Sequence, residues 1–102
     1  MKRKELEDYQ AICITLDGEE SLVDKIHPIL GKLIQHLLDL PEKASKPKIL
    51  ECFKKCILSI NDFEDEIETV ERESILEILY TLGEIVGLDP ESEFAEAWRG
   101  DW

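Results

Sequence analysis

The chain has 102 residues, of which 43% are hydrophobic and 35% are charged. This length fits one domain, and the composition is too apolar for a disordered protein. Its net charge of −12 argues against nucleic acid and anionic membranes as partners, because both are polyanions. The longest apolar-rich stretch, residues 26–40, is interrupted by polar and charged residues, which argues against a transmembrane helix.

The chain is rich in leucine, isoleucine, glutamate and lysine, and it holds only five glycines and four prolines. This composition favours helices over strands. We therefore expect an all-α fold, with a single helical domain over residues 1–102 and a bundle of about five helices. Residues 1–10 begin with basic residues but soon become acidic, so we expect no targeting segment and a cytoplasmic location.

In the N-terminal part, a first helix is predicted over residues 2–16, where apolar side chains recur at helical spacing. Residues 11–16 could instead form a strand, but no second strand-like run is available to pair with it. A second helical segment is predicted from Glu19 to Leu40. Its long apolar stripe makes it the expected central helix of the core. Pro28 inside this segment either kinks one helix or separates two.

A third helix is predicted to start at Ser45 as N-cap, with Pro47 in its first turn, and to end near Asn61. Its apolar stripe includes Cys52 and Cys56. We interpret both cysteines as small buried hydrophobic residues in a reducing compartment. A single Cys-x3-Cys pair without a second ligand pair is a weak signal for a metal site.

A fourth helix is predicted to open at Asp65 or Glu66 and to end at Gly87. Asp65 and Glu68 have the spacing of a capping box. A short fifth helix is predicted to follow, with Asp89 as its N-cap. The predicted apolar face of the fourth helix consists of Ile67, Val70, Ile75, Ile78, Leu79, Leu82, Ile85 and Val86.

No catalytic or metal-binding arrangement is predicted. Carboxylate-bridged metal sites in helical bundles use Glu-x-x-His on two helices, and here only Asp24-x-x-His27 approaches that pattern. His36 offers no second copy of it. There is no Gly-rich phosphate loop, and the few serines, threonines and cysteines have no histidine placed near them in sequence. We therefore expect no enzyme activity, no cofactor and no bound metal.

The negative charge is concentrated in residues 61–102, which hold fourteen acidic residues and two arginines, whereas residues 1–60 hold ten acidic and ten basic residues. The acids between Asp62 and Glu73 can be a solvated helix start that suits the helix dipole. They can also form an electrostatic docking face for a cationic protein. The residues predicted to bind a partner are Asp62, Glu64, Asp65, Glu68, Glu71 and Trp102. Trp102 either packs against the bundle or is available as an interface residue.

The segment EIETVERESI (66–75), followed by a helix, a glycine, a short acidic helix and RGDW (99–102), resembles a family of small, uncharacterised bacterial proteins. Members of that family carry a similar E-I-E-T-x-x-R-[DE]-x-I segment and end in R-D-W. The resemblance covers about residues 20–102. This chain differs from the family in its N-terminus and in the additional Gly100. The resemblance implies an all-helical bacterial cytosolic protein and no particular reaction.

A looser likeness, of size and charge alone, is to the immunity proteins of bacterial toxin systems. Such proteins cap the basic cleft of a nuclease toxin. The resulting hypothesis is a non-enzymatic binding protein that neutralises a basic toxin and is itself a monomer or weak homodimer. The alternative is a structural or regulatory helical protein that self-associates through apolar surface.

Overall fold

The computed structural model describes residues 3–11, 16–41, 43–89, 94–100 and 102. Within this part of the chain all regular structure is helical, which confirms the all-α fold. The helices are α1 (Arg3–Ala11), α2 (Glu20–Asp39), α3 (Lys46–Asn61) and α4 (Thr69–Ile85), with two short 3-10 helices, η1 (Glu64–Glu66) and η3 (Phe94–Ala97). The expected number of about five α-helices is therefore wrong for the described residues, which form four.

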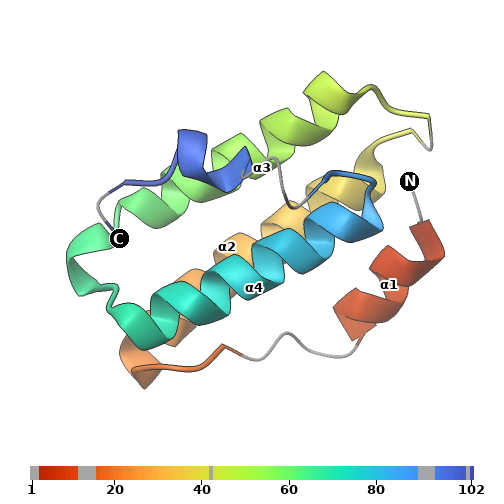
Figure 1. The fold of residues 1–102 in the computed structure, drawn as a ribbon. Coiled ribbons are helices and arrows are strands. Elements are labelled where there is room, and N and C mark those ends of the chain that lie inside the picture. Colours follow the sequence, from red (N-terminus) through yellow and green to blue (C-terminus); the bar gives the residue numbers. More distant parts are fainter. Residues whose placement is uncertain (1–2, 12–15, 42, 90–93, 101) are drawn as a thin grey trace.

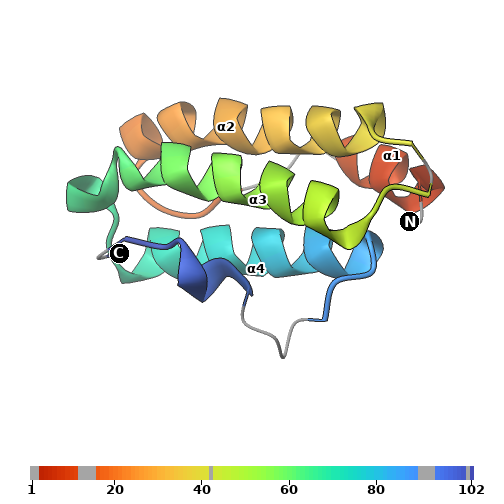
Figure 2. The same ribbon diagram turned by 90° about the horizontal axis from the view of Figure 1, so that it is seen from above.

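The three longer helices lie alongside one another (Figures 1 and 2). Helix α3 packs against α2, and α1 contacts both α2 and α4. The C-terminal η3 contacts α3, on the side that faces α4 (Figure 2). The C-terminal segment therefore lies on the α4 side of α3 and not on its α2 side (Figure 2).

Helix α2 contributes seven buried apolar residues to the core, more than any other described helix, as its long apolar stripe predicts. Its buried residues are Leu22, Ile26, Leu30, Leu33, Ile34, Leu37 and Leu38. Pro28 is exposed and lies inside this one helix. The alternative in which Pro28 separates two helices is therefore wrong.

Helix α3 starts after Ser45, as predicted, but the Ser45 side chain forms no capping hydrogen bond. Its backbone carbonyl instead accepts the N–H groups of Lys48 and Ile49. Cys56 is buried, and burial raises the pKa of its thiol to about 12. Cys52 is half-buried, and desolvation also raises the pKa of that thiol. The interpretation of Cys56 as a small buried hydrophobic residue is confirmed.

The start of α4 differs from the prediction. The helix begins at Thr69, not at Asp65 or Glu66, and residues 64–66 form η1. Between the two elements Ile67 is extended, with φ −83° and ψ 121°, and only 9% of it is exposed. Burial of this apolar side chain interrupts the helical path, because an extended residue cannot continue a helix.

Val70 was predicted to lie on the apolar face of α4, but 55% of it is exposed. The first turn of α4 buries Glu71 in its place. The rest of the predicted face is correct at Ile75, Ile78, Leu79 and Leu82, all of which are buried. The helical periodicity therefore predicts the buried positions correctly in the body of α4. It does not do so in the first turn, where Glu71 is buried as part of the capping box.

The predicted C-terminal cap at Gly87 is confirmed. Gly87 has φ +89°, its N–H donates to the carbonyl of Glu84 at 3.1 Å, and the N–H of Leu88 donates to the carbonyl of Gly83 at 2.7 Å. These two bonds are the Schellman pattern, in which a glycine in the left-handed region closes the last turn of a helix.

The predicted fifth helix falls partly on residues 90–93, which lie outside the described residues. Its described part, η3, is a single 3-10 turn and not an α-helix. A segment this short is marginal as an isolated α-helix, and its position here is fixed in part by one buried ring. The ring of Phe94 contacts Phe53 of α3 and Tyr80 of α4 edge-on, with centroid distances of 5.1 Å and 5.0 Å.

Candidate partner-binding surface at the α3–α4 turn

Four of the six predicted partner-binding residues lie in the short connection between α3 and α4. Asp62 is the C-cap of α3, Glu64 and Asp65 belong to η1, and Glu68 is the N-cap of α4. Asp62, Asp65 and Glu68 are exposed, whereas Glu64 is half-buried. We call residues 62–68 the acidic turn, since five of these seven residues are acidic. These four residues are close in sequence, and the structure places them all on this one connection.

At its α4 end, the acidic turn is held by a capping box. The predicted pair Asp65 and Glu68 is wrong, and the pair is Glu68 and Glu71. The carboxylate of Glu71 accepts the backbone N–H of Glu68 at 3.1 Å. Such a box satisfies backbone donors that the first turn of a helix leaves without partners. Both acid pairs have the same spacing, and burial of Ile67 decides between them.

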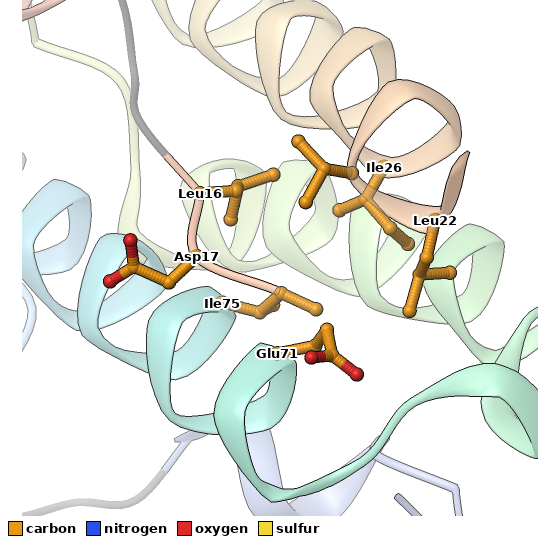
Figure 3. A pocket seen from close by; sticks show the side chains of 7 residues that line it. Leu16, Asp17, Leu22, Ile26, Glu71 and Ile75 are labelled. Atoms are coloured by element: carbon orange, nitrogen blue, oxygen red, sulfur yellow. The ribbon is translucent and has the colours of Figure 1, made fainter. Parts of the chain in front are cut away.

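Glu71 is only 8% exposed, so it does not belong to a docking face and that part of the prediction is contradicted. The segment before α2 covers it (Figure 3). Gly18 lies there with φ +134°, and a Cβ on this glycine would collide with the Glu71 side chain. The neighbouring N–H of Asp17 donates to Ser74 Oγ at 3.1 Å. The segment before α2, which is far away in sequence, thus holds the start of α4 in place.

The hollow around Glu71 is not a ligand site. It is lined by apolar residues of α2 and α4 together with Leu16 and Asp17, and its cavity volume is about 0 Å³. In Figure 3 the carboxylates of Asp17 and Glu71 point in different directions. Paired carboxylates that share a proton or a metal must converge on one point, so this pair has no such role.

At its α3 end, the acidic turn is held by Asn61. The Asn61 Oδ1 atom accepts the backbone N–H of Gly100 at 2.9 Å and the indole N–H of Trp102 at 2.6 Å. Its Nδ2 donates to the carbonyl of Trp98 at 2.8 Å. One side chain on α3 therefore fixes three points of the C-terminal segment. The sequence signal for this role is weak, because an asparagine at a helix end is common for local reasons.

Trp102 is 4% exposed and belongs to the core cluster. Of the two alternatives for this tryptophan, packing against the bundle is the one observed, and its assignment as a partner-binding residue is contradicted. A buried indole N–H needs an acceptor, and Asn61 supplies it. The guanidinium of Arg99 lies 5.7 Å from the Trp102 ring centroid and also pairs with Glu96 at 2.8 Å.

Gly100 gives this C-terminal segment its close fit to the acidic turn. A Cβ at position 100 would collide with the Glu64 carboxylate and press on Asn61. Glu64 is therefore half-buried because the C-terminal segment lies beside it. Gly100 therefore has a structural role, since it lets the backbone approach the acidic turn.

The middle of the acidic turn is tied to α2. Lys25 Nζ lies 3.0 Å from Glu66 Oε1 and 5.7 Å from the centroid of the Phe63 ring. The Lys25 and Glu66 side chains are 46% and 44% exposed, so solvent screens the pair and its contribution to stability is small, about 0–1 kcal/mol. The other exposed acidic residues of the turn are Asp62, Asp65 and Glu68.

Comparison of the chain with protein-family models, curated proteins and solved structures found no match. Among the residues that the structure describes, no group of three or more His, Cys, Asp or Glu side chains could hold a metal ion. No helix in that part of the chain is long and apolar enough to cross a membrane.

Proposed function

We propose that the protein is a non-enzymatic binding protein that docks on a basic protein surface through the acidic turn. The observation that supports this most is the combination of exposed charge with a fixed backbone. Asp62, Asp65 and Glu68 are exposed, while Asn61 and Glu71 on either side are held by hydrogen bonds. A docking surface whose backbone is already ordered loses less conformational entropy on binding.

The charge of the acidic turn also favours docking on a basic protein surface. Adjacent carboxylates of one sign attract a cationic surface over the Debye length, which is about 8 Å at physiological ionic strength. This attraction raises the rate of encounter and aligns the two partners. The net charge of −12 adds a long-range field of the same sign. Binding is therefore expected to weaken steeply as salt concentration rises.

The narrower form of the proposal is that the partner is a nuclease-type toxin and that this protein neutralises it by capping its cleft. A nuclease binds a polyanion, so its cleft is basic. The acidic turn offers carboxylates of the same sign as a phosphate backbone, on a rigid connection. This form rests on charge complementarity.

Self-association through apolar surface has less support. On the described part of the chain, the exposed large hydrophobic residues are Leu58 and Val70, at 47% and 55% exposure. A stable interface buries a contiguous patch of roughly 800 Å² on each partner, with an apolar centre. Single exposed aliphatic residues are ordinary on soluble proteins. Docking through charge is the better supported of the two.

The test compares two variants that lose the same charge. In the first, Asp62→Asn, Asp65→Asn and Glu68→Gln neutralise the acidic turn. In the second, Asp8→Asn, Glu51→Gln and Glu84→Gln remove three exposed acids elsewhere. Each protein is immobilised and exposed to lysate of the native host, and bound proteins are identified by mass spectrometry.

We expect one basic protein to be retained by the natural chain and by the second variant, and to be lost with the first. Retention should also fall at about 0.5 M salt, where screening is far stronger than at physiological ionic strength. If the partner is then shown to be a nuclease whose activity the protein blocks, the narrower form stands. Equal retention by both variants would contradict the proposal.

A further inference from the structure

The groove between α2 and α3 encloses a cavity of about 120 Å³. Its floor is formed by the buried Leu33 and Cys56 and by the half-buried Ile29 and Cys52. This floor is apolar, because both thiols are protonated at neutral pH: desolvation raises the pKa of each one. The groove lies on the side of α3 that the C-terminal η3 does not cover (Figure 2).

The rim of this groove is cationic, although the chain has twice as many acidic as basic residues. Lys32 and His36 lie one turn apart on α2, and Lys55 lines the opposite wall on α3. All three side chains are exposed. Within the described residues no ion pair engages Lys32 or Lys55, in contrast to Lys25, which pairs with Glu66.

Ser59 completes the lining, one turn after Lys55. Its hydroxyl donates to the carbonyl of Lys55 at 3.0 Å, so the hydroxyl oxygen can only accept a further hydrogen bond. The hydrogen-bond donors of the groove are therefore the ammonium groups of Lys32 and Lys55, which lie above the apolar floor. Carboxylates and other anions are the groups that such donors bind most strongly.

We propose that this groove binds a small organic anion, a short-chain aliphatic carboxylate. Its aliphatic part would lie on Leu33 and Cys56, and its carboxylate between Lys32 and Lys55. The cavity volume corresponds to about four water molecules at ~30 Å³ each, and it is smaller than the ~150 Å³ cavity known to bind benzene. A chain of a few carbons fits this volume.

Both contributions to affinity are modest. The floor removes only a few methylene groups from water, and the rim lysines are exposed and screened. The dissociation constant is therefore expected in about the millimolar range. This site is independent of the acidic turn, so a chain with the turn neutralised should bind the anion as the natural chain does.

The test is a titration of the full chain with sodium butyrate, followed by ¹H–¹⁵N NMR. Backbone amides of residues 29–36 and 52–59 should shift along one saturable curve. The Lys32→Gln, Lys55→Gln double variant should bind about tenfold more weakly, the equivalent of 1.4 kcal/mol. The Lys46→Gln, Lys48→Gln variant carries the same net charge but alters exposed lysines outside the groove, and it should bind unchanged.

Two further titrations define the ligand class. Neutral 1-butanol tests the apolar floor alone, and inorganic phosphate tests the cationic rim alone. Equal shifts with butanol, or equal affinity for phosphate, would overturn the proposal. It would equally be overturned if butyrate shifted no amide of the groove at about 20 mM, well above a millimolar dissociation constant.

Discussion

Two sets of residues in the C-terminal part of this chain were both predicted to bind a partner, but the structure places them differently. Glu71 and Trp102 are buried and hydrogen-bonded, and they hold the chain together. Asp62, Asp65 and Glu68 are exposed on the connection that these contacts fix. An acidic run is therefore not one unit: Glu71 is buried in the capping box, Glu68 is exposed although it belongs to the same box, and Asp62 and Asp65 are exposed outside it.

The largest expected effect is at Trp102. Replacement by alanine removes a buried indole and leaves a cavity, so Trp102→Ala should lower the free energy of unfolding by about 3–5 kcal/mol. Urea denaturation measures this change. Trp102→Phe keeps most of the apolar burial and should cost clearly less. If Trp102→Ala unfolded at the same urea concentration as the natural chain, the packed position of this side chain would be wrong.

Asn61→Ala is expected to have the next largest effect. It removes the acceptor of two N–H groups and the donor to the Trp98 carbonyl, which leaves partly buried polar groups without partners. A fully buried group left without a partner costs about 1–3 kcal/mol, and these three groups are only part-buried, so a total loss of about 2–4 kcal/mol is expected. The neighbouring Asp62→Ala, at an exposed position, serves as control and should change stability by less than about 0.5 kcal/mol.

Glu71→Ala should destabilise the protein by about 1–2 kcal/mol, since it removes one half of the capping box. Exposed Glu73 on the same helix is the matched control, and Glu73→Ala should have little effect. The measurement is the urea midpoint of unfolding for each of the two variants. Equal loss from both substitutions would mean that the helix dipole, and not the cap, is what Glu71 serves.

The Lys25–Glu66 pair is expected to contribute least. A double-mutant cycle with Lys25→Met and Glu66→Gln should give a coupling free energy of about 0–1 kcal/mol, because both side chains are nearly half exposed. The value should fall in high salt. A coupling energy above that range, or one that salt leaves unchanged, would place this pair among the contacts that hold the acidic turn.

Much of the fold could be predicted from periodicity. The apolar stripes of α2 and α3 and the cap at Gly87 depend on local sequence, and each was predicted at nearly its observed position. The start of α4 could not be predicted in this way. Two acid pairs with identical spacing compete there, and burial of Ile67 in the core favours the later one.

Of the six predicted partner-binding residues, four lie together on the acidic turn, whereas the burial of the other two could not be predicted from local sequence. Whether Trp102 packs or is exposed depends on Asn61, which lies 41 positions away in sequence, and local pattern carries no such information. The same limit applies to Glu71, whose burial depends on Gly18 in the segment before α2. Contacts between distant segments therefore divide the acidic run into structural and exposed parts.

The most direct test of the account is a paired measurement on the variant with Asp62→Asn, Asp65→Asn and Glu68→Gln. Its free energy of unfolding and its binding to the basic partner are measured at the same salt concentration. We predict stability within about 1 kcal/mol of the natural chain, since the carboxylates are exposed and glutamine retains an oxygen for the helix cap. We also predict that binding is lost. Unchanged binding by a folded variant would contradict the claim that these carboxylates form the docking surface.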